Sequence, residues 1–365
     1  RETSFSEMFS FLSNNTLSRA ELSDKGTIKN IHYGDVLIKF GDVIDANSTS
    51  IPFVGSETAL KKKTDYLQTG DVIIADTAED DTVGKATEIL NENHIPVVSG
   101  LHTIPCRPNL SFVSSYLGYY FNSKSFHEQL YPFMQGIKVT SISKANLGKT
   151  LISYPEPTEQ RKISGLLNLI TARIEKQRQL VDLLKSYKRG LLHQVFSNID
   201  CTVPLYKISD YFSSSNTMAM IECCGEGKYP VYDAGGIIAN IATYDFDNPY
   251  IAIIKDGSGV GRLQLCSGQS SIIGTLGALL PINCTVDYLY AALQTVDFRQ
   301  FTTGMAIPHI YYKDYKNIAI PYPNEVTQRS IENLAKNFDE ILLRENSLLL
   351  HLQQQKTALL QQLFI

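Results

Sequence analysis

One glycine-rich segment, Lys255-Asp-Gly-Ser-Gly-Val-Gly261, has the composition of a loop that could wrap a phosphate. A nucleotide-binding loop of this kind leads into a helix, whose N-terminus binds the phosphate. Here the runs on both sides, 251–254 and 263–265, are apolar and strand-like, and no helix opens after the loop. The pattern therefore favours a glycine hairpin or an exposed loop over a nucleotide site.

A second segment, Asp247-Asn-Pro-Tyr250, is similar to the Asn-Pro-Pro-Tyr segment with which DNA amino-methyltransferases hold a flipped base. One of the two prolines that shape that loop is missing. The sequence also has no glycine-rich loop after a strand that could hold S-adenosylmethionine. We therefore expect this chain to transfer no methyl group and to hold no cofactor of its own.

The cysteines and histidines point to no catalytic or metal site. The six cysteines form no CxxC pair, and the seven histidines are scattered along the chain. Zinc sites in proteins need closely spaced ligands of these types. We expect reduced thiols and a cytoplasmic protein, with no catalytic residue and no metal.

The composition suits a protein of two or three packed domains. The chain has 365 residues, of which 43% are hydrophobic and 19% charged. It has no apolar run of the roughly 18 residues that span a bilayer. The first residues lack a signal-peptide pattern and a methionine, so we expect the native start to lie upstream. A net charge of −4 neither supports nor excludes DNA binding, because phosphate contact needs only a local basic surface.

The elements that would position any site are arranged as an internal repeat. When the chain is shifted by 168 positions, 16 of the 61 aligned pairs between 136–196 and 304–364 are identical. The match includes 136–142 on 304–310, 152–155 on 320–323 and 160–163 on 328–331. A repeat of this length indicates a duplicated structural unit.

Each repeat changes character at a Tyr-Pro step. Before it, short β-branched runs alternate with turn residues, and we expect strands at 70–75, 94–98 and 250–254. After it, apolar residues recur at alternating steps of three and four over roughly 40 residues, a length of about 60 Å in a helix. Pro157, Glu156 and Glu159 suit the start of the first helix.

The heptad pattern of the two long helices predicts a coiled coil rather than an ordinary core helix. The first series is interrupted by Gln177 and Lys188, and the second by Glu345 and Lys356. The predicted seam consists of Ile163, Leu167, Ile170, Ile174, Val181, Leu184 and Leu191 in the first helix, and Ile331, Phe338, Leu342, Leu349, Leu352 and Leu359 in the second.

These observations predict an α+β architecture of two mixed α/β globules, each followed by a long helix. We expect a first globule at 1–155, a central helix at 156–200, a second globule at 201–323 and a C-terminal helix at 324–365. If the helices pair with each other, they must run antiparallel to place the globules at opposite ends. The expected molecule is a pseudo-twofold dumb-bell.

This arrangement resembles the specificity subunit of type I restriction–modification enzymes. The resemblance rests on Tyr154-Pro155…Gln160-Arg161 and its copy Tyr322-Pro323…Gln328-Arg329. It rests also on the segments Tyr66-Leu-Gln-Thr-Gly-Asp-Val-Ile-Ile-Ala75, Ser99-Gly-Leu-His-Thr103, Tyr229-Pro-Val-Tyr-Asp-Ala-Gly-Gly236 and Lys255-Asp-Gly-Ser-Gly-Val-Gly261. In one respect the chain departs from the pattern. The second unit opens with 203–212, whereas the first begins near the middle of that element, at 5–9, so we expect its leading strand to be cut short.

The resemblance implies two target-recognition domains, each reading one half of an interrupted double-stranded DNA site. It implies that the paired helices bind two methyltransferase subunits, with restriction/translocase subunits joining through them. Adenine methylation and DNA cleavage, with their S-adenosylmethionine, ATP and Mg, would lie on those partners. The resemblance implies no membrane partner.

Base readout needs side chains at the groove edges, and affinity needs Lys or Arg near phosphates. In the first globule the candidate DNA-binding residues are Lys61, Lys62, Lys63, Lys85, Lys138, Thr140 and Lys144. In the second they are Lys255, Ser258, Arg262, His309, Tyr311 and Lys313. For any one of them, a solvated surface residue is the alternative.

Other interpretations of the whole chain stay open. The first long helix has a local balance of +4, from eight Lys or Arg against four Asp or Glu between 156 and 189. That charge fits contact with spacer DNA and docking of a methyltransferase equally well. The chain could also be a coiled-coil scaffold whose globules bind protein, a specificity subunit of a related non-translocating restriction system, or a stand-alone enzyme.

Overall fold

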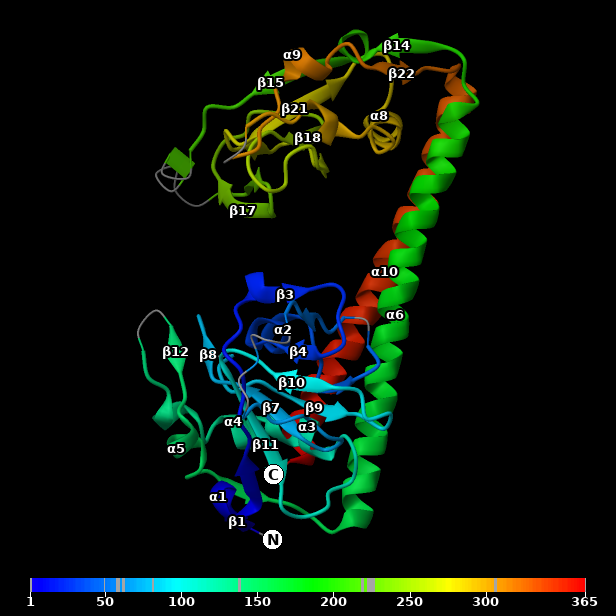
Figure 1. Cartoon of the computed structure of the whole chain (residues 1–365). Coiled ribbons are helices and arrows are strands. Elements are labelled where there is room, and N and C mark those ends of the chain that lie inside the picture. Colours follow the sequence, from blue (N-terminus) through cyan, green and yellow to red (C-terminus); the bar gives the residue numbers. More distant parts are fainter. Residues whose placement is uncertain are drawn as a thin grey trace. The chain divides into compact units, whose positions relative to one another are not determined.

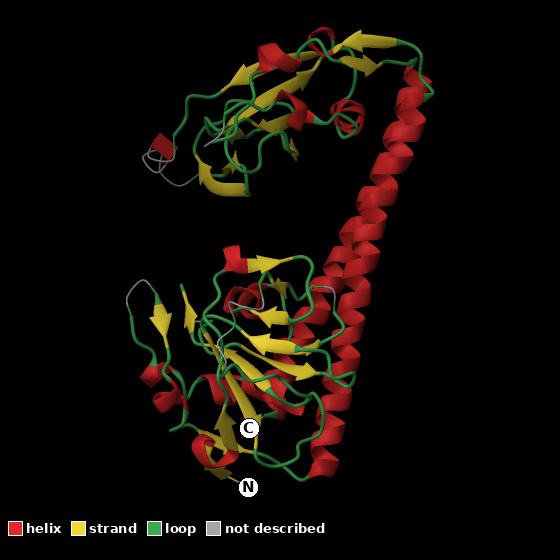
Figure 2. Ribbon diagram, in the orientation of Figure 1, coloured by secondary structure: helices red, strands yellow, loops and turns green. Residues whose placement is uncertain are grey.

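The computed structural model describes residues 2–48, 50–56, 60, 63–80, 82–136, 139–217, 220–221, 227–304 and 307–364. The chain forms two compact units, each of which includes part of both long helices. Unit 1 comprises Arg1–Gln177 and Leu348–Ile365, and unit 2 comprises Arg178–Ser347. Each unit is described by itself. Figure 2 shows that both combine sheets, short helices and stretches of long helix.

Unit 1 is built on a five-stranded sheet with the order β2-β11-β7-β9-β5. Its strands are β2 (Phe9–Phe11), β11 (Thr103–Pro108), β7 (Val72–Ala75), β9 (Ala86–Leu90) and β5 (Val43–Asp45). All four residues of β7 are buried, as the apolar run in the sequence predicted. A second sheet, β10-β4-β6-β3, consists of β10 (Val97–Ser99), β4 (Lys29–Ile31), β6 (Phe53–Val54) and β3 (Leu22–Ser23).

The remaining elements of unit 1 are short. Two strand pairs, β1 (Glu2–Ser4) with β13 (Leu151–Ser153) and β8 (Thr77–Ala78) with β12 (Thr140–Ser141), are antiparallel. The helices are α1 (Phe5–Met8), α2 (Tyr33–Ile38), α3 (Tyr116–Phe121), α4 (Lys124–His127) and α5 (Lys144–Leu147), with 3₁₀ turns at Arg19–Glu21 and Tyr131–Phe133. Aromatic residues of α3 form a buried core with Ile163, Leu167 and Phe364 of the long helices and their ends.

Unit 2 repeats the same plan with four strands in its main sheet, in the order β15-β21-β18-β19. These are β15 (Ser209–Ser213), β21 (Leu276–Pro281), β18 (Tyr250–Ile254) and β19 (Leu263–Cys266). The smaller sheet is formed by β17 (Gly236–Ile241), β16 (Tyr229–Asp233) and β20 (Ser271–Ile272), and β14 (Thr202–Pro204) pairs with β22 (Ala319–Pro321). The helices are α8 (Val286–Leu293) and α9 (Tyr312–Tyr315), with 3₁₀ turns at Leu205–Lys207 and Phe298–Phe301.

The two long helices lie within the ranges expected for them, 156–200 and 324–365, and each is more buried along one face. They are α6 (Pro157–Ser197) and α10 (Glu325–Leu363). Within α6 the predicted seam residues Ile163, Leu167, Ile174 and Val181 are buried, and within α10 Ile331 and Leu352 are buried. The other predicted seam positions are half-buried, while their neighbours on the helix surface are mostly exposed. The predicted seam positions therefore lie on the more buried face of each helix.

Contacts within each unit show that α6 and α10 run antiparallel there. In unit 2, Lys188 near the end of α6 donates to Asp339 of α10 at 2.7 Å, and the rings of Tyr187 and Phe338 lie 5.8 Å apart. In unit 1, residues 166–173 of α6 and 352–362 of α10 line one groove. The early part of each helix thus lies beside the late part of the other. The predicted mixed α/β fold with antiparallel long helices is confirmed.

The Tyr-Pro…Gln motif closes the joint between globule and helix. In unit 1 the amide of Gln160 donates to the Pro155 carbonyl at 2.9 Å, and its oxygen accepts from the Val113 amide at 3.0 Å. In unit 2, Gln328 donates to the Pro323 carbonyl at 2.9 Å. Both glutamines are buried. In both units a buried glutamine side chain is thus paired with a backbone carbonyl just before the helix, as a buried polar group requires.

Two sequence-based expectations about strands were wrong. The leading strand of unit 1 is not cut short, because β1 pairs with β13 over three residues, as β14 pairs with β22 over three. The strand expected at 94–98 begins at Val97 instead. His94 has a φ of 52°, which is outside the extended region, and Pro96 has no N–H to donate to a sheet.

Candidate nucleic-acid interface

In unit 2, backbone hydrogen bonds hold the segment after β18 against the segment before α9. The Gly257 N–H donates to the Pro308 carbonyl, and the Ile310 N–H donates to the Lys255 carbonyl, both at 2.9 Å. Thr303 and His309 exchange two bonds of 2.9 Å across the intervening turn. We name the described residues of 255–262 and 303–313 the polar edge of unit 2.

The residues predicted to contact DNA in the second globule gather on this polar edge. Tyr311 is 50% exposed, the ring of His309 lies 5.0 Å from its ring, and the Lys313 ammonium lies 5.3 Å above that ring. Lys255 donates to the Ser213 hydroxyl at 2.8 Å, and burial lowers the pKa of its ammonium. Ser258 and Arg262 are exposed in the turn between β18 and β19, so the glycine-rich segment is the hairpin that the sequence predicted.

Unit 1 has the same backbone framework. The Ile142 N–H donates to the Asp76 carbonyl at 2.9 Å, and Gln135 and Ser141 exchange bonds of 3.1 and 2.8 Å. β12 pairs with β8 beside it (Figure 1). Gly136 and Gly304 have φ values of 122° and 90°, which favour glycine at the start of each turn. The described residues of 76–78 and 135–144 form the polar edge of unit 1.

The predicted residues of the first globule are less concentrated. Thr140 and Lys144 lie on the polar edge, where Lys144 donates to the Leu12 carbonyl at 3.1 Å and its ammonium lies 5.8 Å from the Phe11 ring. Lys63 is exposed in a turn. Lys61, Lys62 and Lys138 lie outside the described residues.

Lys85 differs from the other candidates. Its ammonium donates to the Leu37 carbonyl at 2.6 Å, and burial lowers its pKa. It is half-buried and lies near Asp42 and Lys356 rather than on the polar edge. These contacts favour an internal structural role over a phosphate contact.

The sequence analysis missed a cluster that Asp76 and Thr77 of the polar edge of unit 1 form with His102. His102 Nδ1 lies 3.3 Å from a carboxylate oxygen of Asp76, and the Thr77 hydroxyl donates to the same oxygen at 2.7 Å. The side chains of His102 and Asp76 are 46% and 26% exposed. Asp76 directly follows the run 66–75, and His102 lies within 99–103, both of which were noted only as family motifs. The positions of Asp76 and His102 beside these motifs were the signal in the sequence that could have identified them as site residues.

The part of the chain that the structure describes holds no group of three or more His, Cys, Asp or Glu side chains placed to bind a metal ion. The same described residues include no helix that is long and apolar enough to cross a membrane.

Comparison with known proteins finds a family model and a curated relative that each match part of the chain. Residues 204–352 match the type I restriction modification DNA specificity domain. A curated relative, the type I restriction enzyme MjaVIII specificity subunit of Methanocaldococcus jannaschii, is 29% identical over 119 residues. That match covers 31% of this chain and 28% of the relative, so the chain spans less than a third of the length of the curated relative it matches.

Two solved structures have the same fold over the full length of this chain. The type I restriction-modification system S subunit from M. genitalium aligns with a TM-score of 0.57 at 16% identity, covering 100% of this chain and 96% of that one. A chain from a study of complex assembly and conformational transition of the type I R-M system aligns with a TM-score of 0.60 at 16% identity, covering 100% and 97%. These matches confirm the resemblance drawn from the motifs. Residues 204–352 thus match the type I restriction modification DNA specificity domain, and the whole chain has the fold of the type I restriction-modification system S subunit from M. genitalium.

Proposed function

We propose that this chain is the sequence-specific DNA-binding subunit of a type I restriction–modification complex, in which each unit reads one half of an interrupted site. One observation carries the proposal. The two polar edges share a backbone hydrogen-bond pattern, yet Lys255, His309 and Tyr311 stand in unit 2 where unit 1 has Asp76, Ser141 and Ser143. A common frame with different side chains is what two different half-sites require.

Exposed cations near the polar edges support contact with the phosphate backbone. Lys144 in unit 1 and Arg262 and Lys313 in unit 2 are exposed. Such contacts supply affinity without sequence information, while neighbouring polar side chains discriminate bases. The net charge of −4 is compatible with this function. A surface can be locally basic while acidic residues elsewhere in the chain make the total charge negative.

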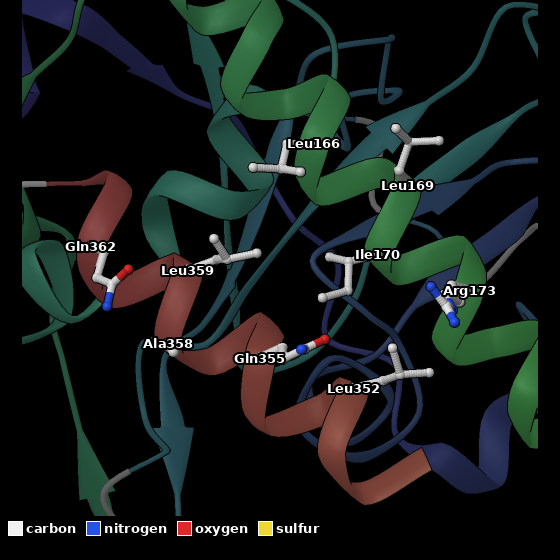
Figure 3. Close-up of a pocket in the computed structure, with 9 residues that line it drawn as sticks. All are labelled: Leu166, Leu169, Ile170, Arg173, Leu352, Gln355, Ala358, Leu359 and Gln362. Atoms are coloured by element: carbon white, nitrogen blue, oxygen red, sulfur yellow. The ribbon is translucent and has the colours of Figure 1, made fainter. Parts of the chain in front are cut away.

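The long helices are the surface on which methyltransferase subunits dock in this proposal. Their faces away from the seam carry large exposed apolar side chains, among them Leu169, which is 73% exposed, and Leu183, which is 64% exposed. In unit 1 an apolar groove of 490 Å³ lies between α6 and α10. Figure 3 shows Leu166, Leu169 and Ile170 of α6 across from Leu352, Ala358 and Leu359 of α10. Exposed apolar patches of this kind mark protein interfaces.

The repeat supports two such partners, one for each half of the chain, with restriction/translocase subunits joining the same complex. In this proposal the chain is not an enzyme, and adenine methylation and DNA cleavage lie on the partners together with S-adenosylmethionine, ATP and Mg. Because its target is cellular DNA, the complex would act in the cytoplasm. Labelled S-adenosylmethionine incubated with the pure chain and genomic DNA should leave the DNA unlabelled, and incorporation of label would contradict this assignment.

A binding selection from a library of random duplexes tests the DNA-reading function. We expect enrichment of a site with two specified segments separated by unspecified base pairs. We also expect the affinity to fall with salt, by a slope of about 0.9 for each phosphate contact in a plot of log affinity against log salt. Uniform, weak binding with no enriched sequence would favour a scaffold whose globules bind protein.

A further inference from the structure

Asp76, Thr77 and His102 occupy the position in unit 1 that Lys255, Asp256 and Thr275 occupy in unit 2. Two pairs of backbone bonds establish the match. The carbonyls of Asp76 and Lys255 accept from Ile142 and Ile310, each at 2.9 Å. Their N–H groups donate to the carbonyls of His102 and Thr275, at 3.1 and 2.9 Å. The position that follows the central strand of the main sheet therefore carries opposite charges in the two units.

A carboxylate at a DNA-binding edge has a restricted set of partners. It is repelled by phosphates, so it gains affinity only by accepting a hydrogen bond from a base. In the major groove the available donors are the amino groups of cytosine N4 and adenine N6. An ammonium at the same position instead meets the guanine acceptors O6 and N7, or a phosphate.

The contacts of Asp76 within the protein hold its carboxylate in place for such a role. One oxygen accepts from the Thr77 hydroxyl at 2.7 Å and lies 3.3 Å from His102 Nδ1. His102 is itself fixed by the ring of Tyr33, 5.2 Å away in an edge-on arrangement. Within the described residues, the side-chain contacts of Asp76 involve this one oxygen, and the side chain is 26% exposed. An ordered, part-exposed acceptor loses little conformational entropy when it binds a base.

From this geometry we propose that Asp76, oriented by Thr77 and His102, reads an amino-bearing base in the half-site of unit 1, while its counterpart Lys255 reads an acceptor or a phosphate in the other half-site. This inference rests on the proposed DNA-reading function and specifies how that function differs between the units. Asp76 contacts the base, and His102 is a positioning residue that acts through Asp76.

The test compares base preferences of full-length variants in the same duplex selection. Asp76→Asn keeps the size of the side chain but removes its charge and adds a donor. We expect it to lose discrimination at one base pair of one half-site by roughly 5- to 100-fold, with the other half-site unchanged. Asp76→Lys, which copies Lys255, should move the preference at that base pair from cytosine or adenine towards guanine. His102→Gln should weaken the same preference without moving it to another position.

Glu92→Gln is the matched control. Glu92 is exposed in the turn after β9, at the opposite end of the β7–β9 pair from Asp76. The Glu92→Gln variant therefore removes one negative charge from the same unit at a distance from the polar edge. We expect its selected site to match that of the unaltered chain. Thermal unfolding of every variant separates a change in reading from a change in folding, and Asp76→Asn should leave Tm within a few degrees of the unaltered chain.

Two outcomes would overturn the inference. If Asp76→Asn and Asp76→Lys both select the same site with the same enrichment as the unaltered chain, Asp76 does not read a base. If Asp76→Asn weakens binding to both half-sites equally, the cluster acts on folding or on general affinity. A failure of the unaltered chain to select any site is a separate result, which would reject the proposed function itself.

Discussion

At the scale of single residues, the long helices contain charged side chains at seam positions where apolar ones are expected. Lys188 and Lys356 are equivalent positions of the repeat, and both find carboxylates. Lys188 lies 2.7 Å from Asp339, and Lys356 lies 2.5 Å from Asp42, with its ammonium 5.5 Å from the Tyr119 ring. The side chains of Lys356 and Asp42 are 18% and 11% exposed, so neither charge is well solvated without the other.

Asp42→Asn should therefore destabilise unit 1 by about 3 kcal/mol, since it leaves the Lys356 ammonium without its carboxylate in a poorly solvated place. Denaturant unfolding at neutral pH measures this loss. Glu128→Gln is the control, because its pair with Lys124 spans 3.6 Å between side chains more than half exposed. That change should cost less than about 1 kcal/mol. Equal losses in the free energy of unfolding for the two variants would show that the Asp42–Lys356 pair stabilises the chain no more than an exposed ion pair does.

Glu88 predicts a dependence of stability on pH. Its buried carboxylate accepts from the N–H groups of Ser115 and Gly118 at 2.7 and 2.9 Å, yet burial raises its pKa to about 7 from an ordinary value of 4.5. Between these pH values the folded chain binds the proton more tightly than the unfolded chain does. This contribution to stability is complete below pH 4.5 and is lost as the pH rises through 7, by roughly 3 kcal/mol.

Glu88→Gln does not titrate, so its free energy of unfolding should vary less between pH 5 and pH 7 than that of the unaltered chain. Urea unfolding at a series of pH values gives the two slopes. The variant should also be less stable at low pH, because an amide has one acceptor for N–H groups that the carboxyl served with two oxygens. Parallel pH profiles for the two proteins would assign the dependence to another group.

At the scale of elements, periodic apolar patterns in the sequence identified the helices and strands whose residues pack against a core. The long helices and β18 were found because packing against a core imposes a period of 3.5 or a continuous apolar run. The strand at 94–98 was misplaced because Pro96 and the left-handed His94 interrupt an otherwise suitable run. The cluster of Asp76 and His102 was missed because it forms only when segments around 76, 102 and 141 pair through their backbones, and no local pattern records that pairing. Lys85 looked like a surface lysine because a sequence does not show that its ammonium meets the Leu37 carbonyl.

Two leucines two positions apart test the seam of α6. Leu167 is 0% exposed and packs in the core of unit 1, whereas Leu169 is 73% exposed on the same helix. Leu167→Ala should cost about 2–5 kcal/mol through lost burial and a cavity. Leu169→Ala should stay within about 0.5 kcal/mol and instead weaken binding of a methyltransferase subunit, if that subunit docks on the groove. Similar unfolding energies for the two variants would contradict the assignment of the seam.

At the scale of the whole molecule, the duplication divides the chain into two units with matching frameworks. β1 pairs with β13 in the register in which β14 pairs with β22, and the Gln160 and Gln328 joints close in the same way. The resemblance and the repeat were visible in the sequence, and the family model that matches residues 204–352 agrees with the resemblance. In the proposed function, the DNA sequence that each unit reads would depend on the side chains of the polar edges, which differ between the units.

The central claim is that each unit reads one half-site independently, and replacing one globule by the other tests it most directly. Residues 2–155 would be inserted in place of 202–323, since the strand pairs and the Tyr-Pro joints at both ends correspond. The altered and unaltered chains would be compared by selection from the same duplex library. The account predicts that the altered chain selects the half-site of unit 1 twice and loses the half-site of unit 2. Retention of the original two-part site, or loss of both half-sites in a folded protein, would contradict it.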